Sequence, residues 1–286
     1  MTDGIPPDHR ATDLSRVVER VRSGIVRMCS SPEGGHLGSS LSIADILTAL
    51  YFRILRVSPD APEAPDRDIF ILSKGHGAVA LYSVLAARGF FPARELDTFG
   101  RPGTRLMAHP VRAVPGVEFA TGSLGHGLAV ALGFALAAAR SDGDRRTFVL
   151  LGDGELQEGS VWEAAAVAAA QGADGLTSIV DCNSLQLNGA TGPLQSEASL
   201  ADRWRSFGWS VRHVDGHDVH AVASQLDVTP WEPGRPSVLL ARTVKGNGVP
   251  FAEGKVRSHY ARLSPRQRDR ALAALSRHGT RGAGDG

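Results

Sequence analysis

The amino-acid sequence predicts an α/β fold: a doubly wound, mostly parallel β-sheet with helices on both faces. Short apolar runs, which are typical of buried strands, alternate along the chain with longer segments whose apolar residues recur at helical spacing. Such alternation favours a parallel sheet whose strands are joined by helices. We expect one domain over residues 12–278, with flexible ends at residues 1–11 and 279–286.

The middle of the chain shows the clearest strand–helix–strand unit. The apolar run 147–151 leads into a Gly-Asp-Gly turn centred on Asp153 and a helical pattern, and a second run at 176–180 leads to Asn183. Asp153 and Asn183 would then sit at the carboxyl ends of parallel strands, where doubly wound sheets bind ligands. The glycines and the free N–H groups of the helix start suit a diphosphate, and the two oxygen ligands suit Mg²⁺. The alternative is an ordinary turn with an Asp cap and an unrelated Asn.

The segments before this unit begin with a helix at 12–29, which has one apolar face, and a glycine-rich loop. Ser42 and Asp45 predict a capping box at the start of a second helix. Further expectations are a surface loop at 57–67, a strand at 68–72, a helix that stops at Gly89, a short helix at 92–99, an irregular segment at 100–124 and an Ala-rich helix that ends at Arg140. The all-round apolarity of this last helix predicts burial in the core or against a partner chain.

The remaining segments continue the alternation of helices and strands. We expect a helix at 196–208, a strand at 209–215, a helix capped by residues 215–218, a strand at 237–243 and a final helix from Ser264 to about Arg277. Each strand is thereby followed by a loop at the edge where Asp153 is expected.

Composition bounds the function. The 286 residues are 42% hydrophobic and 21% charged, with a net charge of +1, so nothing points to a nucleic-acid partner or a membrane surface. The two cysteines form no disulfide framework, and neither a signal peptide nor a membrane-spanning run is recognisable. We expect a cytoplasmic protein.

Histidines recur in the expected loops. His36, His76, His126 and His217 each follow a glycine, and His109 and His259 lie in further loops. A single loop histidine is more often a structural or surface residue. Because several of these loops follow strands or precede helices, they could converge on one edge of the sheet. Neutral imidazoles there would bind hydroxyl groups and transfer protons near pH 7, which suits a sugar.

Taken together, these motifs resemble the N-terminal, diphosphate-binding part of transketolase, in the form of the separate subunit of two-chain transketolases. The resemblance covers roughly residues 14 to 262. It rests on Gly35-His36-Leu37-Gly38, Leu72-Ser73-Lys74-Gly75-His76, Ala108-His109-Pro110, the segment 121–127, Gly152-Asp153-Gly154 with Asn183, and Lys245-Gly246 with Gly248 and His259.

The resemblance implies two cofactors, thiamine diphosphate and Mg²⁺, and a role for each matched residue. Asp153, Asn183 and the backbone carbonyl of Leu185 would bind the metal. His36, His109 and His259 would face the sugar. Glu158, with Glu163, would join an acid network that links two cofactor sites, although a solvated helix face is the alternative. Cofactor contacts would come from His76, Gly122, Leu124, Gly152, Gly154, Glu158, Asn183 and His259, with Leu124 packed on the thiazolium ring.

The activity implied is transfer of a two-carbon ketol unit from a ketose or ketose phosphate to an aldose. The family's pyrimidine-binding domain, with the glutamate that protonates the aminopyrimidine, is not found in the sequence. The chain is therefore expected to act only with a C-terminal transketolase subunit, in an α2β2 heterotetramer. Sugars or sugar phosphates would be the substrates.

Departures from the family's pattern put the substrate in question more than the cofactor. Lys74, Ser123 and His126 replace residues of the longest-known transketolases, Ser258 stands where a Trp usually precedes the histidine, and the segment 100–117 diverges. The charge of Lys74 could make a direct contact with the diphosphate.

Three alternatives remain at this stage. The chain could be half of another thiamine-diphosphate enzyme, such as the α chain of a 2-oxo acid dehydrogenase or a relative of deoxyxylulose-phosphate synthase. It could be a non-catalytic regulatory subunit that keeps the cofactor fold, which intact Asp153, Asn183 and Glu158 argue against. It could also be a Mg²⁺-dependent phosphoryl-transfer enzyme, but no P-loop or nucleophile motif is found.

Overall fold

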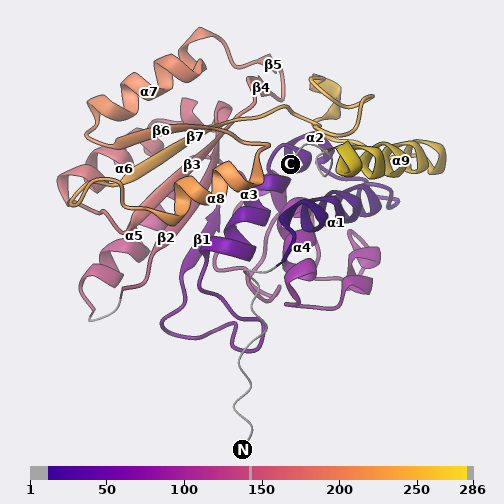
Figure 1. Ribbon diagram of the computed structural model, residues 1–286, viewed down its shortest axis with the longest axis horizontal. Coiled ribbons are helices and arrows are strands. Elements are labelled where there is room, and N and C mark those ends of the chain that lie inside the picture. The colour runs from indigo at the N-terminus through magenta and orange to yellow at the C-terminus, as the bar shows by residue number, and fades with distance from the viewer. Residues whose placement is uncertain (1–11, 142–143, 282–286) are drawn as a thin grey trace, which may run out of the picture.

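The computed structural model describes residues 12–141 and 144–281, and it confirms the predicted α/β fold (Figure 1). Its five-stranded sheet has the order β1-β2-β3-β7-β6, and every neighbouring pair is parallel. The carboxyl ends of all five strands therefore lie along one edge. The strands are β1 (Ile69–Leu72), β2 (Thr147–Gly152), β3 (Leu176–Cys182), β6 (Ser210–Asp215) and β7 (Ser237–Arg242).

Helices cover the sheet, and a small hairpin lies beyond its carboxyl edge. The helices are α1 (Leu14–Met28), α2 (Leu37–Leu41), α3 (Ala44–Ala49), α4 (Ala78–Arg88), α5 (Gly127–Ala139), α6 (Gly159–Ala170), α7 (Glu197–Ser206), α8 (Val219–Asp227) and α9 (Pro265–Arg281). The hairpin pairs β4 (Leu185–Gln186) with β5 (Gly189–Ala190). A π-helical turn follows α3 at Leu50–Ile54, and the segment 93–98 is a 3₁₀ helix.

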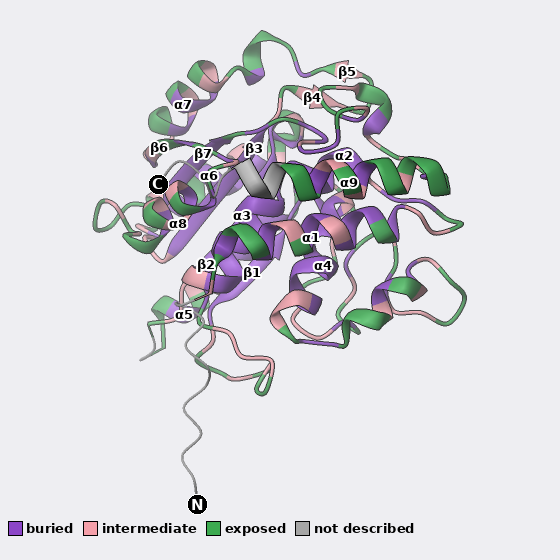
Figure 2. Cartoon of the chain, turned by 45° about the vertical axis from the view of Figure 1, so that its right-hand side comes forward, coloured by how far each residue is buried: buried purple, intermediate pink, exposed green. Residues whose placement is uncertain are grey.

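Each strand sends its side chains alternately into two cores. On β1, Phe70 and Leu72 join the core that also holds residues of α1, α3, α4 and α8, whereas Ile69 and Ile71 join the core formed with α5, α6 and α7. Figure 1 shows the helices on the two sides of the sheet, and Figure 2 shows the strands between them as buried. Burial of both faces explains why these strands are continuous apolar runs in the sequence.

The capping box predicted at Ser42 and Asp45 is wrong. The segment 37–41 is already helical, and the Ser42 hydroxyl donates to the carboxylate of Asp181 at 2.8 Å and to the Ser39 carbonyl. Asp45 pairs with Arg22 at 2.5 Å instead of capping a helix. Buried tertiary partners therefore take the side chains that the local pattern assigned to a cap.

The helix start expected directly after the Gly-Asp-Gly turn is also different. A 3₁₀ turn occupies Gly154–Gln157, and α6 begins only at Gly159, which is exposed. The first turn of α6 does not line the pocket at the carboxyl edge of the sheet. An anion bound in that pocket would therefore contact the 3₁₀ turn and not the N-terminus of α6.

The Ala-rich helix α5 is buried on one side only. Leu128, Ala131 and Ala135 pack into the core, whereas Ala129 and Gly133 are exposed. Burial of the outer side against a partner chain stays a prediction.

The domain boundaries also stay a prediction. Of the ends expected to be flexible, residues 1–11 and 282–286 lie outside the described residues, whereas 279–281 belong to helix α9. Helix α9 runs to Arg281, past its predicted end near Arg277.

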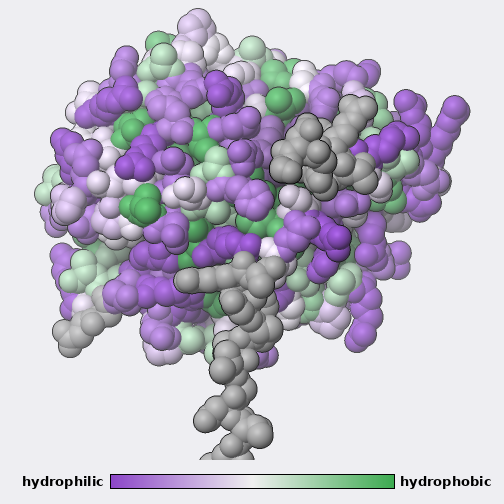
Figure 3. Space-filling model, in the orientation of Figure 1, coloured by the Kyte–Doolittle hydropathy of each residue, from purple (hydrophilic) through white to green (hydrophobic). Residues whose placement is uncertain are grey.

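On the face shown in Figure 3, hydrophobic side chains are scattered in small groups among hydrophilic ones. None of the described helices has both the length and the apolarity that crossing a bilayer requires.

Candidate active site

A pocket of about 300 Å³ opens at the carboxyl edge of the sheet. The loops after β1, β2, β3 and β7 supply most of its wall, and the loops before α2 and α5 supply the rest. Its lining residues are His36, Ser39, Lys74, His76, His109, Gly122, Leu124, Gly152, Asp153, Gly154, Glu155, Asn183, Leu185, Gln186, Leu187, Lys245 and His259. Every residue that the sequence analysis assigned to the metal, the cofactor or the sugar is among them, except Glu158.

Asp153 directly follows the buried strand β2 and is only 2% exposed. Its carboxylate accepts the N–H of Ser184 at 2.5 Å and the N–H of Gly154 at 2.8 Å. Burial raises the pKa of Asp153 to about 7, and the nearby carboxylate of Asp181 adds to the shift. A bound cation would stabilise the ionised form of this carboxylate.

Asn183 and Leu185 lie beside Asp153 in the loop after β3. The Asn183 side-chain carbonyl accepts the Leu185 N–H at 3.1 Å, and its amide nitrogen donates to Asp181 at 2.9 Å. Within the described residues, no three His, Cys, Asp or Glu side chains gather as metal ligands. Asp153, Asn183 and Leu185 offer a carboxylate, an amide oxygen and a backbone carbonyl, a donor set that would suit Mg²⁺, which takes few protein ligands and completes its shell with phosphate oxygens and water.

Four histidines form the other end of the pocket. The ring of His36 lies 5.7 Å from those of His76 and His109 and 5.4 Å from that of His259, measured between ring centroids. His36 and His259 meet because Gly35 and Ala261 form an antiparallel bridge, with N–H to carbonyl distances of 2.9 and 2.8 Å. Segments more than 200 residues apart in the sequence are thereby joined at the pocket.

Three of these imidazoles, those of His36, His76 and His259, are held in the neutral form. Burial lowers the pKa of His36 and that of His259 to about 4, and neighbouring cationic groups add to both shifts. Burial and Lys74 also keep the pKa of His76 well below its usual range. The Nδ1 atom of His36 is buried and has no hydrogen-bond partner in the described part of the chain. Neutral rings with an unpaired nitrogen can bind hydroxyl groups and accept protons.

Two of the six loop histidines do not reach the pocket. His126 is exposed, and its Nδ1 lies 3.0 Å from the Leu124 carbonyl. His217 lies between Asp45, at 3.3 Å from Nδ1, and the Val244 N–H, at 2.7 Å from Nε2. The structure therefore brings four of the six loop histidines together at the pocket, in line with the expectation that several of these loops converge.

Glu158 and Glu163 lie outside the pocket and are exposed. Glu158 stands immediately before α6, beside Gly125, where an added Cβ atom would come within 2.6 Å of the Glu158 Cβ. The described chain places no acid network around them, so their expected role stays a prediction that depends on a partner.

Several lining residues had no assigned role in the sequence analysis. Lys245 donates to the Leu185 carbonyl at 3.3 Å and to His259 Nδ1 at 3.1 Å, and burial lowers its pKa to about 8. Glu155 is buried, and its carboxylate accepts hydrogen bonds from Ser73, Gly125 and Gly152. An acidic residue directly after a Gly-Asp-Gly turn is also typical of a solvated helix, so its position in the sequence did not mark it as buried. Ser39, Gln186 and Leu187 complete this group, and no sequence signal marks them apart from their closeness to His36 and Asn183.

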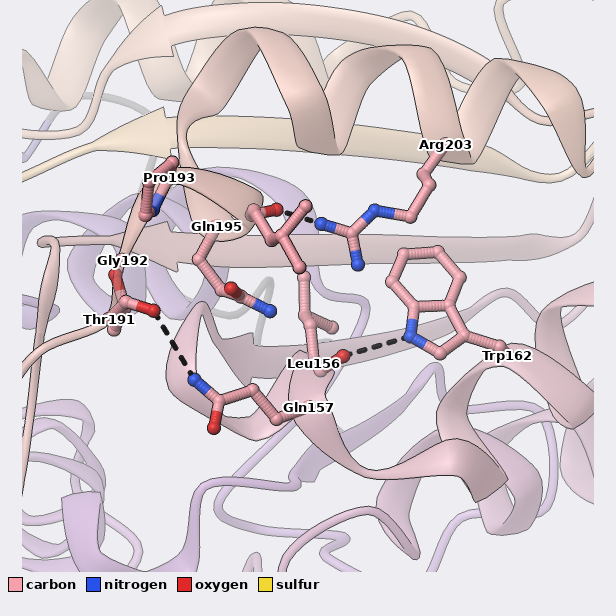
Figure 4. A pocket seen from close by; sticks show the side chains of 9 residues that line it. Leu156, Gln157, Trp162, Thr191, Gly192, Pro193, Gln195 and Arg203 are labelled. Atoms are coloured by element: carbon pink, nitrogen blue, oxygen red, sulfur yellow. Dashed lines mark hydrogen bonds between the residues drawn. The ribbon is translucent and has the colours of Figure 1, made fainter.

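A second pocket, of about 450 Å³, lies between residues 156–162, the segment 191–195 and Arg203 (Figure 4). Its wall includes Trp162, whose indole N–H donates to the Leu156 carbonyl at 2.8 Å, and Gln157, which donates to the Thr191 carbonyl at 3.4 Å. The Arg203 guanidinium lies 5.0 Å from the Trp162 ring centroid and donates to the Leu194 carbonyl. None of the matched cofactor or substrate residues lines this pocket.

Comparison with known proteins gives a consistent family. Residues 14–277 match the model of the transketolase thiamine diphosphate binding domain. The chain is 42% identical over 246 residues to the 6-deoxy-6-sulfo-D-fructose transketolase subunit SqwG of Clostridium sp. (strain MSTE9), an alignment that covers 86% of this chain and 90% of that protein. It is 44% identical over 251 residues to one subunit of the apulose-4-phosphate transketolase of Actinobacillus succinogenes, covering 87% and 90% of the two chains.

Solved structures agree with this relationship. A crystal structure of a transketolase mutant from Pichia stipitis superposes with a TM-score of 0.84 at 27% identity, over 95% of this chain and 45% of that one. The chain thus spans less than half the length of that solved enzyme. The sequence match, the fold and the pocket at the carboxyl edge together show that the chain belongs to the transketolase family, as its thiamine diphosphate-binding domain.

Proposed function

We propose that this chain is the diphosphate-binding subunit of a two-chain transketolase that depends on thiamine diphosphate and Mg²⁺. One observation carries the proposal. A single pocket joins Asp153, Asn183 and the Leu185 carbonyl to a cluster of four histidines, three of them partly buried and His109 exposed. The oxygen ligands, with His76 beside them, suit a metal diphosphate, and the other three histidines suit a polyhydroxylated substrate.

The metal end would hold the cofactor's diphosphate. Asp153, Asn183 and the Leu185 carbonyl would bind Mg²⁺, while His76 and the Gly154 backbone would contact phosphate oxygens. Gly122 and Leu124 line the pocket between the two ends, and Leu124 would pack on the thiazolium ring. When bound, thiamine diphosphate supplies the electron sink for breaking the carbon–carbon bond beside a ketose carbonyl.

The histidine end would orient the sugar and move its protons. His36, His109 and His259 would bind hydroxyl groups of the donor and acceptor. Because burial keeps His36 and His259 neutral at pH 7, each ring offers one nitrogen that can accept a hydrogen bond from a hydroxyl group.

A partner chain would close the pocket. The relatives above are named as transketolase subunits. Four exposed apolar side chains lie at or within two residues of pocket-lining positions: Met107 is 46% exposed, Leu187 64%, Val244 43% and Tyr260 46%. Exposed apolar groups around a site are typical of an interaction surface. We infer an α2β2 assembly with a C-terminal transketolase subunit, in the cytoplasm, in which Glu158 and Glu163 complete a network between two sites.

The substrate would be a ketose or a ketose phosphate, with an aldose as acceptor. The two relatives are named for 6-deoxy-6-sulfo-D-fructose and apulose 4-phosphate. A specialised ketose is therefore a candidate donor beside a common pentulose phosphate.

The test is ketol transfer from xylulose 5-phosphate, 6-deoxy-6-sulfo-D-fructose and apulose 4-phosphate, with Mg²⁺ and thiamine diphosphate. The chain is assayed alone, and then mixed with the product of the neighbouring reading frame. We expect activity only in the mixture, and its loss when Mg²⁺ is removed. Activity of this chain alone would contradict the two-chain proposal. Turnover of a 2-oxo acid but of no ketose would favour a different thiamine-diphosphate enzyme.

A further inference from the structure

The Asp181 carboxylate, behind the metal-binding loop, is the most heavily hydrogen-bonded acid of the pocket region. It is 0% exposed and stands one residue before the end of β3. Its Oδ2 accepts from Lys74 Nζ at 2.5 Å, from Ser42 Oγ at 2.8 Å and from Asn183 Nδ2 at 2.9 Å. Its Oδ1 accepts from the Thr243 hydroxyl. Four segments of the chain therefore meet on one buried carboxylate.

This contact decides which way the Asn183 amide points. A carboxylate that faces an ammonium and three further donors is ionised and can only accept hydrogen bonds. Asn183 must then present its NH₂ group to Asp181, which leaves its oxygen on the opposite side, where it accepts the Leu185 N–H at 3.1 Å. The reversed amide would set oxygen against carboxylate and NH₂ against N–H.

Lys74 directs two of its three N–H donors at the protein, although the residue lines the pocket. Its side chain is 1% exposed, and its ammonium pairs with Asp181 and lies 3.3 Å from the Ser39 carbonyl. Without this ammonium, the buried Asp181 carboxylate would lose its salt-bridge partner. The ion pair therefore balances one of the two buried carboxylates, Asp153 and Asp181, at this wall of the pocket.

We propose that Asp181 is a positioning residue that turns the Asn183 oxygen towards the metal, and that Lys74 is its buried counter-ion and not a contact of the diphosphate. The proposal rests on the proposed cofactor site, because it concerns how a ligand of that site is oriented. It also assigns a role to Lys74, for which the sequence left a direct diphosphate contact open.

A double-mutant cycle in the assembled two-chain complex tests this assignment. The variants are Asp181→Asn, Lys74→Met and the double variant, each measured for Mg²⁺ affinity by calorimetry at saturating thiamine diphosphate and for Tm without cofactors. Asp181→Asn should weaken Mg²⁺ binding by about 10–100-fold, the usual effect of removing a group that orients a metal ligand. The single variants should each lower the Tm, because each leaves one buried charge unpaired.

The double variant separates orientation from stability. It removes both charges, so its Tm should return towards that of the wild type, while its Mg²⁺ affinity should stay as weak as in Asp181→Asn. Lys74→Met should keep Mg²⁺ and thiamine diphosphate affinity within about threefold of the wild type, since Asp181 still orients Asn183. Asp68→Asn is the matched control: a buried carboxylate at the amino end of the sheet, whose loss should lower the Tm but not the Mg²⁺ affinity.

Each other outcome has a definite meaning. Wild-type Mg²⁺ affinity in the double variant would overturn the positioning role. A large loss of thiamine diphosphate affinity in Lys74→Met, with Mg²⁺ saturating, would make Lys74 a diphosphate contact. If the wild-type complex bound thiamine diphosphate without any need for Mg²⁺, the proposed metal site would fail, and the positioning role would fail with it.

Discussion

Two histidines of the pocket make the free energy of unfolding depend on pH. His36 and His259 are neutral because burial lowers the pKa of each to about 4. An unfolded histidine titrates near about 6.5. Between these values the unfolded chain binds more protons than the folded chain, so the contribution of these groups to stability falls as the pH falls.

We therefore predict that His36→Gln makes the free energy of unfolding less dependent on pH between about 6.5 and about 4. The groups facing His36 are His259, His109, Lys245 and Lys74, and their mutual repulsion adds to the effect of burial. Urea denaturation at a series of pH values gives the slope. His220→Gln, which changes an exposed histidine of α8, is the control. Equal slopes in the wild type and His36→Gln would show that His36 is not held neutral.

At the scale of elements, Glu155 ties the loop before α5 to the sheet. Its carboxylate accepts from Ser73 Oγ at 2.5 Å, from the Gly125 N–H at 2.9 Å and from the Gly152 N–H at 3.1 Å. The loop that it holds carries Leu124, which lines the pocket. Gly125 itself has φ of 84°, a conformation that favours glycine.

Glu155→Ala should loosen this loop, because it removes the carboxylate oxygen that accepts the Gly125 N–H and the Ser73 hydroxyl. The buried donor left unpaired should cost about 1–3 kcal/mol. Hydrogen exchange should show faster exchange at the amides of 121–127 than in the wild type. Asp68→Asn should leave exchange in this segment unchanged. If Glu155→Ala lowers the Tm and exchange rises equally everywhere, Glu155 contributes only to general stability.

At the scale of the whole molecule, cofactor binding and folding are linked. A ligand that binds only the folded state stabilises it, by about 2.7 kcal/mol at a ligand concentration of 100 times the Kd. Asp153, which is 2% exposed and has its pKa raised to about 7 by burial, is the group whose ionised form a bound cation would stabilise most.

We predict that Mg²⁺ with thiamine diphosphate raises the Tm of the two-chain complex and that a chelator reverses the increase. Asp153→Asn should abolish the Mg²⁺-dependent part of the increase and leave the fold intact, as judged by circular dichroism. Ser276→Ala changes an exposed hydroxyl of α9 and should behave as the wild type. An unchanged Mg²⁺-dependent increase in Asp153→Asn would remove Asp153 from the metal site.

The sequence by itself determined the strands, the turn around Asp153 and the place of Asn183. Continuous apolar runs mark strands buried on both faces, and this burial is a local property of the pattern. Because parallel strands align their carboxyl ends, the runs also predicted which edge of the sheet carries the ligands.

Only the tertiary structure decided which loops meet at that edge. The bridge between Gly35 and Ala261 brings His36 to His259, whereas His217 turns to Asp45 and Val244. Strand order sets these distances, and no local spacing encodes it. The same holds for Ser42 and Lys74, since both donate to Asp181, a residue more than 100 positions away in the chain. A buried carboxylate takes its donors from whatever the fold places beside it, so their roles followed from packing and not from pattern.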